Sequence, residues 1–168
     1  MTTFLDALHV LSAVLLVGPL MVAPFVGRRA IQRRSADGVR VAANQMNVYG
    51  LGSILTALLG FATMSSSARY SFRDPWIIVS TTLYVVALGV VFVYVVPALR
   101  KAARMVEAGV LIRPEEEDPA QPVSLTATGT DLKTKEELDA LTGRVSGAGL
   151  LVLLVFAIIT MLMTIRPF

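Results

Sequence analysis

Four long apolar segments constrain the fold of this chain more than any other feature. They run from Phe4 to Val26, from Val41 to Met64, from Trp76 to Val96 and from Val145 to Ile165. At about 1.5 Å of rise per residue, each segment is long enough to cross the hydrocarbon core of a bilayer as a helix. The sequence therefore predicts an all-α fold, a transmembrane four-helix bundle with helices over residues 4–26, 41–64, 76–97 and 145–165.

The composition leaves no room for a separate soluble domain of ordinary size. The chain has 168 residues, of which 55% are hydrophobic, so we expect one integral membrane domain over residues 1–168. Cysteine is absent, which excludes disulfides and thiolate metal sites. The net charge of +3 does not indicate a nucleic-acid partner, because Lys and Arg in a membrane protein first determine its orientation.

The basic residues are unequally distributed, and their distribution predicts the topology. Twelve of the fifteen Lys and Arg residues lie within residues 27–40 and 98–144. By the positive-inside rule, these two connections face the cytoplasm and both termini are extracytoplasmic. The first apolar segment has no basic head and no convincing cleavage site, so we expect it to be retained as an anchor. The predicted location is the bacterial cytoplasmic (inner) membrane, which the chain crosses several times.

Local patterns predict where the first helix begins, bends and ends. Thr3 and Asp6 have the spacing of a capping box at the start of this helix. The Gly-Pro pair that ends at Pro19 predicts a kink over residues 15–19, because proline removes a backbone donor and crowds the preceding turn. Pro24 is then expected to mark the cytoplasmic end of the helix.

A long cytoplasmic loop is expected over residues 98–143. It begins with an amphipathic segment that we expect to lie along the membrane surface. The basic residues of this segment are Arg100, Lys101 and Arg104. They favour anionic lipid headgroups, or they serve only to retain the topology, and the sequence leaves both readings open. Residues 113–131 are acidic and rich in Pro, Ser, Thr and Gly, which predicts an extended loop. A short helix over residues 135–141 and a hinge at Gly143 are expected to lead into the fourth helix.

Small residues predict two faces for helix packing. The first face consists of Ser53, Ala57 and Gly60 at roughly one-turn spacing, and the second contains Gly143 and Gly147 as a GxxxG pair. Small side chains let membrane helices approach each other closely. The expected partners, besides the lipid bilayer, are other integral membrane subunits in a homo- or hetero-oligomer.

Asp6 and His9 are the only residues of the four segments that carry charge near neutral pH, and they form the candidate site. Their spacing places them on one face of the helix, and Ser12 continues that line. His9 is suited to bind haem, copper or a quinone, with Asp6 fixing its tautomer. In the alternative, Asp6 caps the helix and His9 reaches the membrane interface or bonds a neighbouring helix. Because the chain has one His and no Cys, bis-imidazole haem ligation would require a second chain.

The start of the chain resembles a known group of membrane proteins. Residues 5–19, in which His9 is followed nine residues later by Gly18, are similar to the start of small bacterial four-helix membrane proteins of unknown function. That group is distantly similar to the copper-resistance CopD domain and to haem-binding HemJ-type oxidases. The resemblance implies a four-helix membrane fold. Those relatives typically show Trp-x-Gly where this chain has Leu16-Val17-Gly18, and the haem-binding ones use further histidines.

The sequence indicates a non-catalytic function. It contains no Walker loop, Ser/His/Asp set or HExxH helix, which disfavours an enzyme or a pump. Its Ala, Val and Arg bias resembles that of actinobacteria, which attach small helical subunits to their respiratory cytochrome supercomplexes. We therefore expect an accessory or assembly subunit of such a complex, without a cofactor. The alternative is a haem-, copper- or quinone-binding protein that uses His9, and a solute or ion transporter is a third class.

Overall fold

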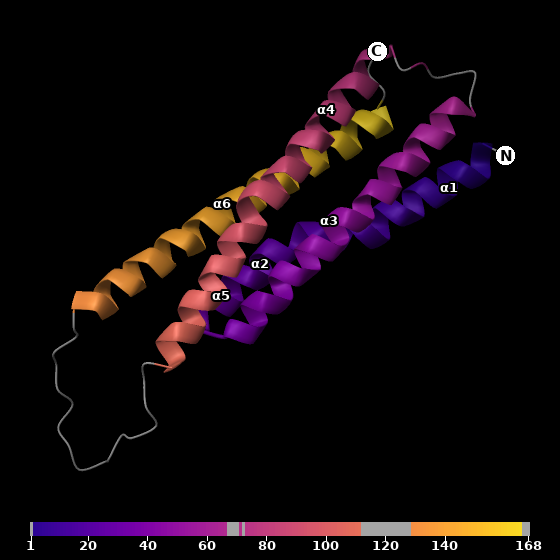
Figure 1. Ribbon diagram of the computed structural model, residues 1–168. Helices are drawn as coiled ribbons and strands as arrows, with labels where there is room; N and C mark the ends of the chain where they lie inside the picture. The colour runs from indigo at the N-terminus through magenta and orange to yellow at the C-terminus, as the bar shows by residue number, and fades with distance from the viewer. Residues whose placement is uncertain (1, 67–70, 72, 112–128, 166–168) are drawn as a thin grey trace.

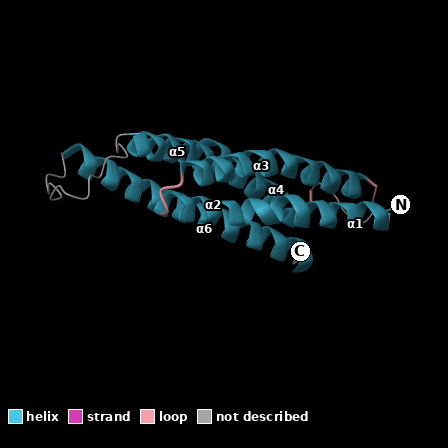
Figure 2. Cartoon of the chain, turned by 90° about the horizontal axis from the view of Figure 1, so that it is seen from below, coloured by secondary structure: helices cyan, strands magenta, loops and turns pink. Residues whose placement is uncertain are grey.

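The chain folds into a bundle of long helices. The computed structural model describes residues 2–66, 71, 73–111 and 129–165, and no strand occurs within them. Four of its helices are long and apolar enough to cross a membrane, which confirms the predicted all-α, four-helix architecture. Figure 1 shows that consecutive spans run up and down the bundle, so that the chain begins and ends at the same end. Figure 2 shows the same elongated bundle from below.

The first span consists of three helical segments that follow one another without a break. They are α1 (Thr2–Ser12), the π-helix η1 (Ala13–Val17) and α2 (Gly18–Gln32). The backbone N–H of Gly18 donates to the carbonyl of Ala13, which closes one wide π turn just before Pro19. The kink predicted for residues 15–19 overlaps this π turn, and π turns are one cause of helix kinks. The predicted N-cap at Thr3 is wrong, because α1 already includes Thr2.

The prediction that Pro24 ends the first helix is also wrong. Pro24 lies inside α2 and is fully buried, and α2 continues to Gln32. It packs against Gly149 of the last helix, where a Cβ atom would lie only 2.6 Å from the Pro24 Cβ. Membrane helices tolerate proline where a neighbouring helix supports the irregular backbone. The glycine provides the room that the proline ring needs.

A tight turn connects α2 to α3 (Ala36–Ser65), where the sequence had suggested a longer connection. Arg34 has a left-handed φ of 52°, and the N–H of Ser35 donates to the carbonyl of Ala30 over 3.0 Å. These are the features of a Schellman motif, with arginine at the position that glycine usually occupies. The Ser35 side chain then accepts from the backbone N–H of Gly38 and caps α3. The predicted loop over residues 27–40 is thus mostly helical.

The third span also contains a π-helix. It consists of α4 (Pro75–Gly89), η2 (Val90–Val95) and α5 (Val96–Leu111). The expected separate helix along the membrane surface is not observed, because α5 continues the span (Figure 1). The buried side chains of Leu99 and Ala102 explain this course, since α5 packs closely on α3 and would lose these contacts if it turned aside.

The fourth span is the single helix α6 (Gly129–Ile165). The predicted hinge at Gly143 and the separate helix over residues 135–141 are wrong, because the backbone continues as a helix through both (Figure 1). Glycine in a helix interior weakens the helix by roughly 1 kcal/mol but does not end it. Together, α5 and α6 replace most of the predicted loop over residues 98–143. The acidic, Pro-rich part of that loop, residues 112–128, lies outside the described residues.

The core is formed where all four spans meet. Its fully buried side chains include Leu20, Met46, Val91, Leu99 and Val152. At the end of the bundle where the chain begins and ends, α1 packs on α3 and α4 packs on α6, and Figure 1 shows these two pairs diverging. The opposite end carries most of the described Lys and Arg residues, and we call it the basic end. The glycines of α3 hold both π-helices close, since Leu16 of η1 contacts Gly52 and Phe92 of η2 contacts Gly50.

Candidate functional site at His9

His9 joins α1 to α3 through a hydrogen bond to the backbone. Its Nδ1 lies 2.9 Å from the carbonyl oxygen of Thr56. Because a carbonyl oxygen only accepts hydrogen bonds, Nδ1 donates, and Nε2 of the neutral ring remains as an acceptor. The Ser12 hydroxyl donates to the carbonyl of His9 over 2.8 Å, so the hydrogen bond of the Ser12 side chain is made within α1. The imidazole therefore has one nitrogen committed to helix packing.

Gly60 makes this close approach possible. A Cβ atom at position 60 would lie 2.9 Å from Cε1 and 3.3 Å from Nδ1 of His9. Such distances are too short for carbon and nitrogen atoms in ordinary contact. The ring of His9 thus lies over a backbone position that has no side chain. Of the first predicted small-residue face, Gly60 contacts His9, Ser53 is fully buried and Ala57 is half-buried.

Asp6 does not approach the imidazole nitrogen that it was expected to orient. The partner of Nδ1 is the α3 backbone, and the Asp6 side chain is exposed. The structure thus agrees with the alternative in which His9 bonds a neighbouring helix. The cap predicted at Asp6 does not form, because α1 begins before Thr3.

Three buried hydroxyl groups lie in the half of the bundle that contains His9. They belong to Thr56, Thr63 and Ser80, and none has a hydrogen-bond partner among the described residues. Many other helical hydroxyls donate to a carbonyl three or four residues earlier, namely those of Ser53, Ser65, Thr82, Thr142, Thr160 and Thr164. A buried polar group without a partner costs about 1–3 kcal/mol. Thr56 and Thr63 flank Gly60 on the side of α3 that meets α1, and they therefore lie on either side of the His9 ring along the helix.

A second polar contact joins α3 to α4. The hydroxyls of Ser53 and Tyr84 lie 2.9 Å apart, and Ser53 also donates to the carbonyl of Gly50 over 2.7 Å. The Tyr84 ring meets the ring of Phe156 edge-on, with the centroids 6.2 Å apart. Sequence reasoning missed the role of Tyr84. The signal was available, because a buried tyrosine in an apolar helix needs a partner for its hydroxyl.

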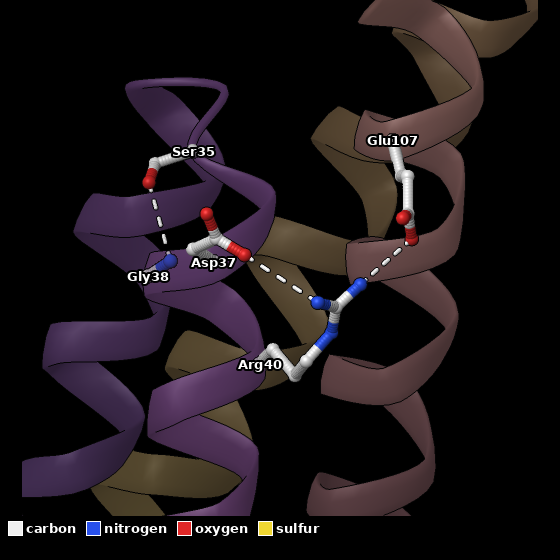
Figure 3. A network of polar contacts seen from close by, with 5 residues as sticks. All are labelled: Ser35, Asp37, Gly38, Arg40 and Glu107. Atoms are coloured by element: carbon white, nitrogen blue, oxygen red, sulfur yellow. Dashed lines mark hydrogen bonds and ion pairs between the residues drawn. The ribbon is translucent and has the colours of Figure 1, made fainter. Parts of the chain in front are cut away.

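Ion pairs connect the helices at the basic end. The guanidinium of Arg40 lies 2.9 Å from a carboxylate oxygen of Glu107 in α5 and 3.4 Å from one of Asp37 (Figure 3). Lys101 of α5 forms an ion pair with Glu137 of α6. All of these side chains are more than half exposed, so each pair is worth at most about 1 kcal/mol.

The three basic residues expected at lipid headgroups are all exposed at this end. Arg100, Lys101 and Arg104 lie on α5, and only Lys101 has an ion-pair partner among the described residues. Their exposure leaves Arg100 and Arg104 available to anionic groups outside the chain.

Comparison with known proteins identifies the family. A family model, DUF2269, described as a predicted integral membrane protein, matches residues 3–123. The chain belongs to the DUF2269 family. The match covers the first three spans and supports the membrane assignment, so this DUF2269 protein lies in the lipid bilayer. No curated protein and no solved structure matches the chain, and the expected similarity to CopD or HemJ domains is not shown.

The second small-residue face of this DUF2269 chain points away from the bundle. Gly143 and Gly147 are exposed, and a Cβ atom at either position would have no neighbour within 4 Å. The buried glycine of this region is Gly149, which contacts Pro24. The GxxxG pair of α6 is therefore not used for packing within the described part of the chain.

Proposed function

We propose that this DUF2269 protein is a non-catalytic accessory or assembly subunit of a larger complex in the bacterial cytoplasmic membrane. The observation that carries the proposal is the outward position of Gly143 and Gly147 on α6. A pair of small residues with this spacing is a common contact between membrane helices. The described part of the bundle makes no use of it, which leaves the surface available to a helix of another subunit.

The exposed face of α6 extends this surface along the span. Leu150, Leu154 and Ile158 follow the glycines at helical spacing, and each is about half exposed. Lipid tails are as apolar as these side chains, so apolar character alone would not select a partner. The specificity of docking would come from the flat backbone at the two glycines.

The proposed orientation places the basic end in the cytoplasm and both termini outside. Arg28, Arg29, Arg33, Arg34 and Arg40 gather at this end with the basic residues of α5. Positive-inside topology supports the assignment. Because the chain lacks cysteine, Ser35→Cys or Ser66→Cys would introduce a single thiol at one end of the bundle. An impermeant thiol reagent added to whole cells should label the second variant and spare the first, and the opposite pattern would reverse the orientation.

The proposal is tested by isolating the protein with its neighbours. Affinity purification in a mild detergent, from cells that express it at native levels, should recover further integral membrane subunits. The respiratory-chain cytochrome supercomplex is the first complex to look for. Gly143→Leu should reduce this recovery because its side chain would cover the contact surface. Gly18→Leu is the control, since a Cβ atom at position 18 also has no atom within 4 Å but position 18 lies on α2 rather than on α6. Recovery of the protein alone would overturn the proposal.

A second candidate function rests on His9. Its Nε2 is left as an acceptor, and the hydroxyls of Thr56 and Thr63 in the same half of the bundle are buried without partners among the described residues, which favours a ligand that both donates and accepts hydrogen bonds. The residues present do not fit haem or copper held by one chain, because His9 is the sole histidine, cysteine is absent and no cluster of three His, Asp or Glu occurs among the described residues. The chemistry that remains is that of a quinone in its reduced, quinol form, whose hydroxyls both donate and accept hydrogen bonds.

Spectroscopy and extraction would decide this second candidate. A Soret band or stoichiometric copper in the purified protein would favour a metal site completed by another chain. Quinone recovered in organic extracts of the wild type, and lost in His9→Phe, would favour the quinone. Asp6→Asn is the control, because Asp6 is exposed and does not contact the bonded ring nitrogen.

A further inference from the structure

Two side-chain contacts join the third and fourth spans at different levels of the bundle. At the first point, the rings of Tyr84 and Phe156 meet edge-on. At the second, Lys101 pairs with Glu137. The two helices run antiparallel, so residues of the third span between 84 and 101 lie opposite residues of α6 between 137 and 156. The ring contact and the ion pair thus mark the two ends of a stretch in which η2 packs on α6 with its inner side.

A groove of about 730 Å³ lies in this stretch, on the outside of the bundle. Its walls come from Val86, Val90 and Val93 on one side and from Ala148 and Leu151 on the other. Gly89 and Gly147 also line it, and neither has an atom within 4 Å of the place where a Cβ would be. The groove therefore exists because two facing positions lack side chains. Along α6 it extends from Arg144 to Leu151, a rise of roughly 10 Å.

One charged side chain lines this apolar groove. Arg144 lies at the edge nearest the basic end, opposite Tyr94. It is exposed, and none of the described carboxylates is within ion-pair distance of its guanidinium. The nearest carboxylate along that face of α6, two turns away, belongs to Glu137 and is paired with Lys101. The charge of Arg144 is therefore available to an anion from outside the described chain, and basic residues near a membrane surface favour anionic headgroups.

A second copy of the chain does not supply this anion. Two copies in one membrane are related by an axis along the membrane normal, so a symmetric contact through the groove would bring Arg144 against Arg144 of the other copy. Like charges at this distance repel. The groove lining contains no carboxylate that could compensate.

We propose that the groove binds an anionic phospholipid, with one acyl chain against the valines and glycines and the phosphate at Arg144. The phosphate accepts charge-assisted hydrogen bonds from the guanidinium, and the Tyr94 hydroxyl is available to the same headgroup. The acyl chain fills the space over Gly89 and Gly147 that the protein leaves open. The site shares Gly147 with the outward face proposed for docking, so a lipid held here would lie beside a partner helix at Gly143.

The test uses the full-length protein in nanodiscs that contain phosphatidylglycerol and phosphatidylcholine in equal amounts. After detergent extraction, native mass spectrometry counts the lipids that remain bound to each chain. The wild type should retain one phosphatidylglycerol in preference to phosphatidylcholine. Arg144→Gln should reduce this preference about fivefold, the equivalent of about 1 kcal/mol for one basic residue at a membrane surface. Gly89→Leu should remove the retained lipid of either kind because its side chain would occupy the acyl site.

Two matched variants separate this site from general effects of charge and size. Arg104→Gln removes an exposed basic residue at the same end, and Gly143→Leu adds the same side chain at an exposed glycine of α6, but neither position lines the groove. Both should retain lipid as the wild type does. The proposal is overturned if these controls lose lipid as strongly as the groove variants, or if the wild type retains both lipids equally. It is also overturned if Val93→Cys, a single thiol in the groove, crosslinks to another membrane protein in cells.

Discussion

The contact between Gly149 and Pro24 gives a quantitative test of how α2 and α6 pack. A Cβ atom at position 149 would lie 2.6 Å from Cβ and 3.2 Å from Cγ of Pro24. Carbon atoms in contact are ordinarily about 3.5–4.0 Å apart, so Gly149→Ala requires the two helices to separate locally by roughly 1 Å. The proline ring is bonded to its own backbone and cannot rotate away. The substitution must therefore strain the bundle.

Gly147→Ala is the matched control for this substitution. It lies two residues away on the same helix, and its new Cβ atom would meet nothing within 4 Å. Both variants gain the same helix propensity, up to about 1 kcal/mol, and this gain cancels when they are compared. Overpacking a tight contact costs about 1–3 kcal/mol. We therefore expect Gly149→Ala to be less stable than Gly147→Ala by about 1–3 kcal/mol.

The free energies of unfolding can be compared by titrating both variants with SDS in mixed micelles. Far-ultraviolet circular dichroism follows the loss of helix, and the single tryptophan, Trp76, provides a second signal. Coincident transitions would justify a two-state treatment. If Gly149→Ala proved as stable as Gly147→Ala, the close approach of α2 and α6 at this level would be refuted.

The polar contacts between helices should show graded effects in the same titration. His9→Phe removes the hydrogen bond to the α3 carbonyl, and we expect a loss of about 0.6 kcal/mol, the average for such bonds in membranes. Tyr84→Phe should cost a similar amount, because the Ser53 hydroxyl keeps its bond to the backbone. Lys101→Met breaks an exposed ion pair with Glu137, and its cost should stay below about 1 kcal/mol and decrease at high salt.

Each of these expected effects would be contradicted by a specific result. A loss at Asp6→Asn as large as that at His9→Phe would show that Asp6 also supports the imidazole. Ser53→Ala should cost no less than Tyr84→Phe, since it removes both hydrogen bonds of the hydroxyl, and the reverse order would argue against the geometry at α4. A salt-independent cost at Lys101→Met would indicate lost packing by its aliphatic stem.

The four spans could be predicted from the sequence because apolar length alone decides which segments can cross a bilayer. A kink near Pro19 was expected because proline acts locally on its own helix, and the structure has a π turn at that place. The ends of the helices were not predictable from apolar length. Helices continue beyond the apolar core into the headgroup region and water, so α2 includes Arg28 and Arg29 and α5 includes Arg100.

The candidate site was predicted only in part, because its contacts join distant parts of the chain. The position of His9 in the first span identified a polar residue that needs a partner. Its partner, the carbonyl of Thr56, is a backbone group and leaves no trace in the composition. The same limit applies to the glycines. Spacing singled out Gly143 and Gly147, whereas the tightest glycine contact with another helix involves Gly149, and only the position of Pro24 reveals it.

The π-helix η1 determines where the first span can accept the insertion or deletion of a residue. Its i to i+5 hydrogen bond encloses one residue more than an α-helical turn. Removing one residue from Ala13–Val17 would restore a regular turn and leave His9 facing Gly60. Removing one residue between His9 and η1 would instead rotate the imidazole by about 100° around the helix axis and turn it towards the lipid. Among related chains, we therefore expect gains and losses of single residues in this span to concentrate at η1.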